Sequence, residues 1–229
     1  MLNKIINSFR IAVPFTDKTP LSAIQLARKE GMGIAELRID LYSSYSNDHV
    51  LREVRKFKKI KTIATIRSKR EGGQWTGHEK KRLALFKAVL PQVDTVDIEL
   101  SSRSILKETI AEAHRLKKTV IVSYHNFKKT PSSSALVGIL KQAKRAGADI
   151  VKIAAMAHSK KDMRTLAEFT LTHAKEGLIT LSMGKEGALS RILFPSLGSL
   201  LTFAHTGHST APGQMDLKTT AFFFKKLYS

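Results

Sequence analysis

The strongest constraint in the sequence is a recurrence of short runs rich in β-branched and apolar residues. The eight runs are Ile11–Phe15, Ala35–Asp40, Lys61–Arg67, Thr95–Leu100, Thr119–His125, Asp149–Ala155, Leu178–Met183 and Ser199–Ala204. Their first residues are 24, 26, 34, 24, 30, 29 and 21 positions apart. Runs of this length and composition are typical of buried strands, and the intervals leave room for helices between them.

The intervals contain amphipathic stretches with the period of a helix. They are Leu21–Glu30, His49–Lys58, Glu79–Leu90, Ser104–Leu116, Ser134–Ala146 and Asp162–Ala174, and Lys218–Leu227 follows the last run. Eight strands alternating with helices in 229 residues predict a (β/α)8 barrel, formed as a single domain by residues 1–229. A doubly wound open sheet is the alternative. That fold usually carries a glycine-rich phosphate loop after its first strand, and Pro14–Lys18 is not such a loop.

The composition excludes several classes of protein. The chain has no cysteine, so disulfides, thiolate catalysis and cysteine-bound metal centres are excluded and a reducing compartment is favoured. No segment approaches the roughly 18 consecutive apolar residues of a membrane-spanning helix. The N-terminal MLNKIINSFRIAVPF lacks the apolar core of a signal peptide. We therefore expect a cytoplasmic protein without a membrane partner.

The formal charge of the chain is +20, from 39 Lys and Arg against 19 Asp and Glu. Such a charge is typical of proteins that bind nucleic acid. The basic residues are spread over many segments, however, and aromatic residues make up only 7% of the chain, too few for an evident base-stacking surface. Solvated helix faces explain this pattern better, so we do not expect nucleic acid as a partner. A positive field also attracts a small anionic substrate.

A (β/α)8 barrel carries its catalytic residues at the carboxyl ends of its strands, and two such positions stand out here. Lys152 lies between apolar neighbours in one run. Burial disfavours an ammonium group, and a neutral amine forms a Schiff base with a carbonyl compound. The alternative is a lysine that a neighbouring carboxylate keeps charged. His125 ends the preceding run, and imidazole is the natural proton shuttle near neutral pH.

Charged residues alternate on two further strands. Glu36, Arg38 and Asp40 share one face of their strand, which we expect to be the barrel interior because the residues between them are apolar. Buried charges must be paired, so an internal network is the minimum that this pattern implies. Asp97 and Glu99 also alternate, so their side chains share one face of a strand. We expect either that one of them orients His125 or that both form ion pairs inside the barrel.

The loops that follow the later strands complete the set of candidates. Arg191 is a candidate clamp for a carboxylate. The segment His205–Gln214 is polar and contains glycine, which is typical of a lid; a phosphate cradle and a simple mobile connection are the alternatives. His205 and His208 lie three residues apart, but they have no third ligand, so we predict no metal site.

Several motifs occur in a fixed order along most of the chain. They are Glu36–Asp40 (ELRID), Thr65–Ser68 (TIRS) with Glu71–Gly73 (EGG), Val122–Phe127 (VSYHNF), Val151–Ala154 (VKIA), Ser182–Gly184 (SMG) with Ser190–Arg191 (SR), Gly198–Ser199 (GS) with Thr202–Phe203 (TF), and Ala211–Gln214 (APGQ). In this order they resemble type I 3-dehydroquinate dehydratase, the Schiff-base enzyme of the shikimate pathway. The resemblance implies a (β/α)8 barrel that needs no cofactor.

The resemblance also implies a role for each residue of the site. Lys152 would form an imine with the C3 ketone of 3-dehydroquinate, and His125 would act as general acid and base. Arg191 would hold the substrate carboxylate, and Met183 would pack against the substrate ring. The remaining substrate-binding residues that the resemblance implies are Glu36, Arg38, Arg67, Glu71, Thr210 and Gln214.

One departure and two alternative functions stay open. The family often has serine where this chain has Thr210, which keeps the hydroxyl. A Schiff-base aldolase is the alternative enzyme, because it also places a lysine on the sixth strand of a barrel. A nucleic-acid-binding barrel without catalysis is the alternative outside enzymes. The sequence leaves a homodimer open.

Overall fold

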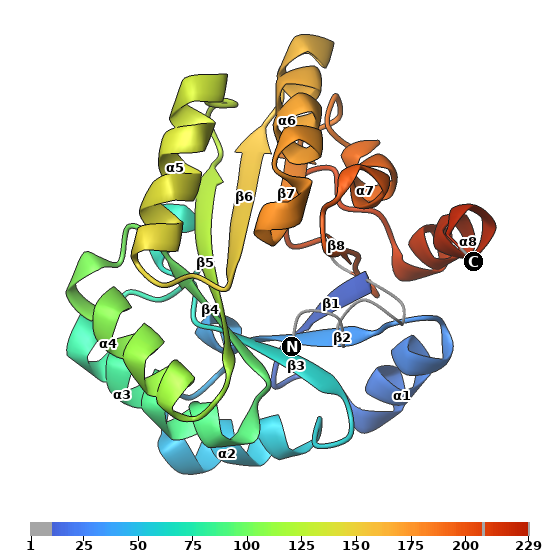
Figure 1. Cartoon of the computed structure of the whole chain (residues 1–229). Helices are drawn as coiled ribbons and strands as arrows, with labels where there is room; N and C mark the ends of the chain where they lie inside the picture. The colour runs from blue at the N-terminus through green and yellow to red at the C-terminus, as the bar shows by residue number, and fades with distance from the viewer. Residues whose placement is uncertain (1–10, 208, 229) are drawn as a thin grey trace.

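The computed structural model describes residues 11–207 and 209–228, and its strands form one parallel sheet that curves into a barrel (Figure 1). The strand order is β7-β6-β5-β4-β3-β2-β1-β8. Between the two ends of this order, a bridge joins Leu178 to Ser199, and Leu200 N donates to Leu178 O at 2.7 Å. The strands are β1 (Ile11–Phe15), β2 (Ile34–Arg38), β3 (Lys61–Thr65), β4 (Thr95–Glu99), β5 (Thr119–Asn126), β6 (Ile150–Met156), β7 (Leu178–Met183) and β8 (Thr202–Phe203). The predicted (β/α)8 barrel is confirmed.

The helices lie outside the sheet, between successive strands (Figure 1). They are α1 (Leu21–Lys29), α2 (Asn47–Arg55), α3 (Glu79–Val89), α4 (Arg103–Arg115), α5 (Ser133–Arg145), α6 (Lys160–Thr172), α7 (Ser190–Leu193) and α8 (Leu217–Leu227). Short 3-10 turns are η2 (Ile39–Leu41), η3 (Lys69–Glu71), η4 (Leu90–Gln92), η5 (Ala174–Glu176) and η6 (Phe194–Leu197). Within the described residues, no helix combines the length and the apolar character needed to cross a bilayer.

Local sequence explains where several helices begin and end. Ser159 and Asp162 form a capping box at the start of α6, and Ser132 caps α5 through Ala135 N. Such caps satisfy backbone N–H groups that have no partner within the helix. Gly147 follows α5 with φ +102°, a conformation that glycine adopts at low cost.

Alternation along the strands separates two apolar layers. Val96, Ile98 and Ile153 point outward and pack in the layer under the helices. Ile121 and Ile179 belong to the second layer, which fills the barrel interior. The polar residues of the inward faces therefore gather at the carboxyl end of the barrel, above this apolar interior.

Four predicted strands are shorter in the structure than expected, and one of them, Thr95–Leu100, loses only its last residue. The run 35–40 leaves the sheet after Arg38, because Asp40 lies in η2 and binds the Arg38 guanidinium instead of extending the strand. The run 61–67 ends as a strand at Thr65. Of the run 199–204 only Thr202–Phe203 is strand. There the Ser199 hydroxyl accepts a bond from Thr180 N at 3.0 Å, so a side chain replaces a backbone pair.

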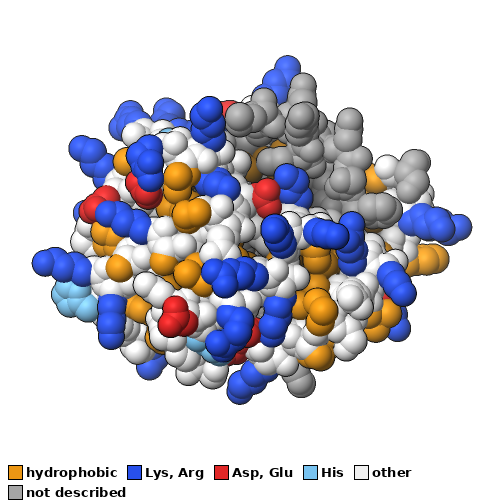
Figure 2. All heavy atoms as spheres, turned by 90° about the horizontal axis from the view of Figure 1, so that it is seen from below, with side chains coloured by type: hydrophobic (Ala, Val, Ile, Leu, Met, Phe, Trp, Pro, Cys, Tyr) orange, Lys and Arg blue, Asp and Glu red, His pale blue; other side chains and the backbone are white. Residues whose placement is uncertain are grey.

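Basic side chains are scattered over the face that Figure 2 shows, among apolar and uncharged groups, rather than gathered in one patch. Helix ends account for part of this distribution, since α1, α2, α5 and α8 each carry two basic residues in the last turn. Cations there interact favourably with the helix dipole. That nucleic acid is not a partner stays a prediction.

Candidate active site

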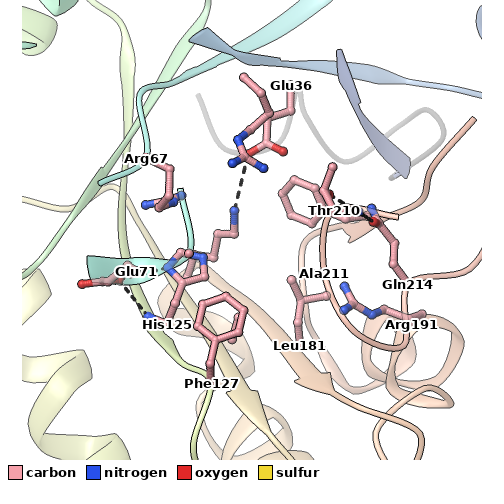
Figure 3. Close-up of a pocket in the computed structure, with 15 residues that line it drawn as sticks. Glu36, Arg67, Glu71, His125, Phe127, Leu181, Arg191, Thr210, Ala211 and Gln214 are labelled. Atoms are coloured by element: carbon pink, nitrogen blue, oxygen red, sulfur yellow. Dashed lines mark hydrogen bonds and ion pairs between the residues drawn. The ribbon is translucent and has the colours of Figure 1, made fainter. Parts of the chain in front are cut away.

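A cavity opens at the carboxyl end of the barrel and contains nearly all the residues predicted for the site (Figure 3). About 520 Å³ of space within it is not filled by protein atoms, and part of this space is open to solvent. The predicted residues that line it are Glu36, Arg38, Arg67, Glu71, His125, Lys152, Arg191, Thr210 and Gln214. Segments that are far apart in the sequence, from β2 to the loop before α8, therefore meet at one place.

Lys152 is buried, and two carboxylates surround its amine. Its Nζ lies 2.9 Å from Asp97 Oδ2 and 3.7 Å from Glu36 Oε1. The same Nζ lies 4.2 Å from the centre of the Phe203 ring, within the range of a cation–π contact. The flanking residues predicted a lysine in an apolar setting, and the structure adds the ion pairs that were the alternative.

Arg67 connects Lys152 to a wider network of buried charges. Its Nη2 lies 2.7 Å from Asp97 Oδ1, and its Nη1 lies 3.2 Å from Glu99 Oε1 and donates to Ser123 Oγ at 2.7 Å. Burial alone would raise the pKa of Asp97, but the charges of Arg67 and Lys152 hold that pKa well below its usual range. Asp97 is therefore a carboxylate at neutral pH.

His125 is held by Glu71 and not by the carboxylates of β4. Glu71 Oε2 accepts a bond from the His125 backbone N–H at 2.9 Å and lies 3.0 Å from Nδ1. Two roles were open for Asp97 and Glu99, and the structure shows the second: both form internal ion pairs with arginine or lysine. Neither of them makes a hydrogen bond to His125 among the described contacts.

The charge state of His125 follows from its surroundings. Its side chain is only 10% exposed. Burial, together with the positive charges of Arg67 and Lys152, lowers the pKa of His125 well below its ordinary value of 6.5. The imidazole is therefore uncharged near neutral pH, as a general base must be.

Two of the charged residues on β2 have partners of their own. Arg38 donates to Asp40 through Nε at 3.0 Å and Nη2 at 2.8 Å, a bidentate pair. Glu36 Oε1 accepts a bond from Thr65 Oγ1 at 2.9 Å. The expectation that these charges are paired inside the barrel is met: Glu36 and Arg38 line the cavity, Asp40 pairs with Arg38, and Glu36 lies 3.7 Å from Lys152 Nζ.

Arg191 lies across the cavity from His125 (Figure 3) and is 2% exposed. Within residues 11–207 and 209–228, no carboxylate lies within 4.0 Å of its guanidinium. Its Nη2 donates to Pro212 O at 3.5 Å, and its Nε finds no partner among the described atoms. Burial lowers the pKa of Arg191 to about 10, so the group is still charged at pH 7. A buried cation of this kind is suited to bind an anionic group.

The segment 209–214 lies over this side of the cavity and is held by side-chain and backbone contacts. Gln214 Oε1 accepts bonds from Thr210 N at 2.7 Å and from Thr210 Oγ1 at 3.1 Å. Gly184 N donates to Pro212 O at 3.2 Å. The Thr210 hydroxyl therefore bonds to a side chain of its own segment, and its predicted contact with the substrate stays a prediction. His208, which the sequence analysis considered with His205, lies outside the described residues.

Met183 departs from the expected arrangement. It is 1% exposed and packs in the apolar interior of the barrel, outside the cavity lining. The apolar part of the lining comes instead from residues that the sequence analysis gave no role, namely Phe127, Ala154, Leu181, Phe203 and Ala211. Four of these, Phe127, Ala154, Phe203 and Ala211, lie within the motifs of the resemblance, which was the available signal; Leu181 lies outside them.

Comparison with known proteins identifies the chain. The family model described as type I 3-dehydroquinase matches residues 11–227. The chain belongs to this family. Relatives named 3-dehydroquinate dehydratase include one from Thermodesulfovibrio yellowstonii, 37% identical over 94% of both chains. Another, from Methanocaldococcus jannaschii, is 39% identical over 91% of this chain and 94% of its own.

Solved structures agree with the sequence matches. The 3-dehydroquinate dehydratase of Aquifex aeolicus superposes with a TM-score of 0.84 at 34% identity, covering 96% of this chain and 99% of its own. The type I enzyme of Clostridium difficile, described with covalent modified comenic acid, has a TM-score of 0.88 at 28% identity and covers 96% and 92%. The predicted family, its barrel fold and its class, a hydro-lyase of the shikimate pathway, are confirmed.

Proposed function

We propose that the chain converts 3-dehydroquinate to 3-dehydroshikimate through an imine on Lys152, with His125 as general acid and base. One observation carries the proposal: a buried amine, a buried imidazole and a buried guanidinium that has no carboxylate partner among the described residues line the same cavity. An amine and an imidazole are the groups that imine chemistry requires, and the guanidinium fits a substrate carboxylate.

The first step uses the amine of Lys152. His125 takes a proton from the Lys152 ammonium, Nζ attacks the C3 carbonyl carbon, and the carbonyl oxygen leaves as water after it receives this proton and one from Nζ, which gives the protonated imine. When protonated, the imine withdraws electrons and makes the neighbouring C2–H bond more acidic. Asp97 and Glu36, at 2.9 and 3.7 Å from Nζ, stabilise the positive charge of the protonated imine.

His125 then performs the proton transfers of the elimination. Because Glu71 Oε2 engages Nδ1, the second ring nitrogen, Nε2, keeps its lone pair for catalysis. Nε2 removes the C2 proton and leaves an enamine, which expels the C1 hydroxyl as His125 returns the proton to it. The departing group is therefore water, and hydrolysis of the imine by a second water releases the product and regenerates the lysine.

The other cavity residues bind and orient the substrate. Arg191 would hold the carboxylate, since its guanidinium is buried without an acidic partner among the described residues. Glu36, Arg38, Arg67 and Gln214 would bind the ring hydroxyls, and Thr210 would close the lid through Gln214. For Met183 we propose no direct contact with the substrate ring. Its place is taken by the apolar side chains that line the cavity, Leu181 and Phe203 among them.

Reductive trapping tests this function. The protein is mixed with 3-dehydroquinate and borohydride, and the modified peptide is identified by mass spectrometry. We expect one adduct, on the peptide that carries Lys152, and none in Lys152→Ala. The exposed Lys160 provides the matched control, because Lys160→Ala should trap as the wild type does. His125→Ala should still form some adduct while turnover falls by about 10²–10⁴-fold.

The same experiment separates the alternatives. An adduct accompanied by carbon–carbon bond cleavage without dehydration would favour an aldolase. No adduct and no consumption of 3-dehydroquinate would overturn the proposal altogether. A cytoplasmic location and a homodimer stay predictions; fractionation of cells and light scattering of the purified protein test them.

A further inference from the structure

Outside the cavity, one arginine from the helix layer reaches into the charge network of the barrel. Arg82 lies on α3 and is fully buried. Its Nη2 pairs with Glu99 Oε2, and its Nε donates to Ile66 O at 2.8 Å. Its Nη1 donates to Ser102 Oγ at 3.0 Å. Arg82 is absent from the cavity lining, so it does not contact a substrate bound there.

The two carboxylate oxygens of Glu99 bind different partners. Oε2 is engaged by Arg82 and also accepts a bond from Ser102 Oγ at 2.7 Å. Oε1 lies 3.2 Å from Arg67 Nη1 and accepts a bond from Ser68 N at 2.8 Å. The orientation of this carboxylate, and hence the place of Arg67, therefore depends on what holds Oε2.

The contacts continue from Arg67 to the amine of Lys152. Arg67 Nη2 lies 2.7 Å from one oxygen of Asp97, and the other oxygen of Asp97 lies 2.9 Å from Lys152 Nζ. We infer that Arg82 is a positioning residue of the active site: by holding Glu99 it fixes Arg67 between Glu99 and Asp97, with its guanidinium at the cavity.

Loss of Arg82 would change the charges around Glu99. Among the described residues, Arg67 would then be the one guanidinium paired with Glu99, and both carboxylate oxygens could turn toward it. Attraction between opposite charges is strong in a buried site, so Arg67 would move toward Glu99 and away from Asp97 and the cavity. This inference rests on the proposed function, in which Arg67 binds a substrate hydroxyl.

A purely structural role is the competing explanation. Arg82 also ties α3 to the residue after β3 and to the start of α4 through Ile66 and Ser102. Removing it would leave Glu99 as a buried charge with fewer partners, which destabilises a protein. The test must therefore separate a loss of substrate binding from a loss of stability.

The test compares three variants for their KM, kcat and free energy of unfolding. In Arg82→Gln we expect KM for 3-dehydroquinate to rise about tenfold while kcat changes less. Ser102→Ala is a milder change that removes one donor from the same oxygen of Glu99, and we expect KM to rise about threefold. Thr170→Val is the matched control. It breaks a buried Thr170–Thr180 hydrogen bond of 2.6 Å between α6 and β7, away from the network, and should lower stability without raising KM.

The outcomes distinguish the two proposals. If Arg82→Gln and Ser102→Ala keep the wild-type KM, the inference is overturned. If Arg82→Gln does not fold, Ser102→Ala decides alone, because it leaves every charge in place. If KM rises equally in Thr170→Val and Ser102→Ala, the rise follows from lower stability alone, and the inference is also overturned. Failure of the wild type to form the borohydride adduct on Lys152 would instead overturn the proposed function.

Discussion

Glu71 and His125 are joined twice through a single carboxylate oxygen. Glu71 Oε2 accepts a bond from the backbone N–H of His125 at 2.9 Å and lies 3.0 Å from its Nδ1. A carboxylate only accepts hydrogen bonds, so Nδ1 carries the ring proton in this arrangement. The relationship fixes both the orientation of the imidazole and the tautomer that leaves Nε2 free to act as a base.

Removing Glu71 should therefore slow the chemical steps more than it weakens binding. In Glu71→Ala we expect kcat to fall about 100-fold with KM changed much less, because general acid–base catalysis is lost with the orientation of His125. Glu71→Gln keeps one acceptor oxygen, so its kcat should fall less than that of Glu71→Ala. Steady-state kinetics measure kcat and KM of both variants. Glu108→Ala, an exposed carboxylate paired with Lys87, is the control, and a wild-type kcat in Glu71→Ala would contradict the role.

The pH dependence of His125 gives a second prediction. Burial and the charges of Arg67 and Lys152 lower the pKa of His125 well below 6.5. A base is active when deprotonated, so loss of the active form should occur only as the pH falls below 6.5. Removing a nearby cation favours the imidazolium, so Arg67→Gln should raise the pKa of His125 and move this loss to higher pH.

Nuclear magnetic resonance of the imidazole nitrogens measures this titration in the free enzyme, independently of turnover. The other histidines in the same spectra serve as internal controls. A His125 titration at or above pH 6.5 in the wild type would contradict the prediction, as would a downward shift in Arg67→Gln.

Arg191 gives a third prediction, in which activity and stability change in opposite directions. Burial without a carboxylate partner in the described chain makes this cation costly to the fold. Arg191→Met keeps a long side chain and removes the charge, so we expect the free energy of unfolding to rise by about 1 kcal/mol. KM should rise about 10- to 100-fold, since a hydrogen bond to a charged group contributes about 1.5–3 kcal/mol.

Chemical denaturation and steady-state kinetics measure these two effects. Arg115→Met is the matched control, because Arg115 is exposed and paired with Glu112 on α4. Its KM should equal that of the wild type. An unchanged KM in Arg191→Met would show that the guanidinium does not hold the substrate.

Periodicity made the fold and the faces of the strands predictable from the sequence. The alternation of charged and apolar residues placed Glu36 and Arg38 inside the barrel, where they line the cavity. The same alternation could not select between Leu181 and Met183, because both lie on the inner face of β7. Met183 is the last residue of β7, so its place along the strand favoured it, yet Leu181 lines the cavity and Met183 packs against other apolar side chains. Side-chain packing at the end of the strand decides this, and the alternation does not predict it.

The partners within the site were less predictable. Glu71 and His125 are 54 residues apart, and their contact depends on the path of the loop after β3. Asp97 meets Lys152 across the intervening strand β5, at a distance that the radius and tilt of the barrel determine. The resemblance supplied the residues of the site, whereas these pairings required coordinates.

The segment 209–214 gives the last prediction, because its backbone closely approaches that of Gly184. Gly213 has φ +73°, and a Cβ added there would lie 2.5 Å from Gly184 O. Gly213→Ala must therefore displace this segment from Gly184, which moves Pro212 O away from Arg191. An alanine in this left-handed backbone conformation also lowers the free energy of unfolding by about 1–2 kcal/mol. We expect kcat/KM to fall about tenfold.

Gly207→Ala is the matched control, because a Cβ at Gly207 meets no atom within 4 Å in the described structure, and its kcat/KM should stay near the wild-type value. If both variants behaved alike, the contact between Gly213 and Gly184 would have no part in closing the site.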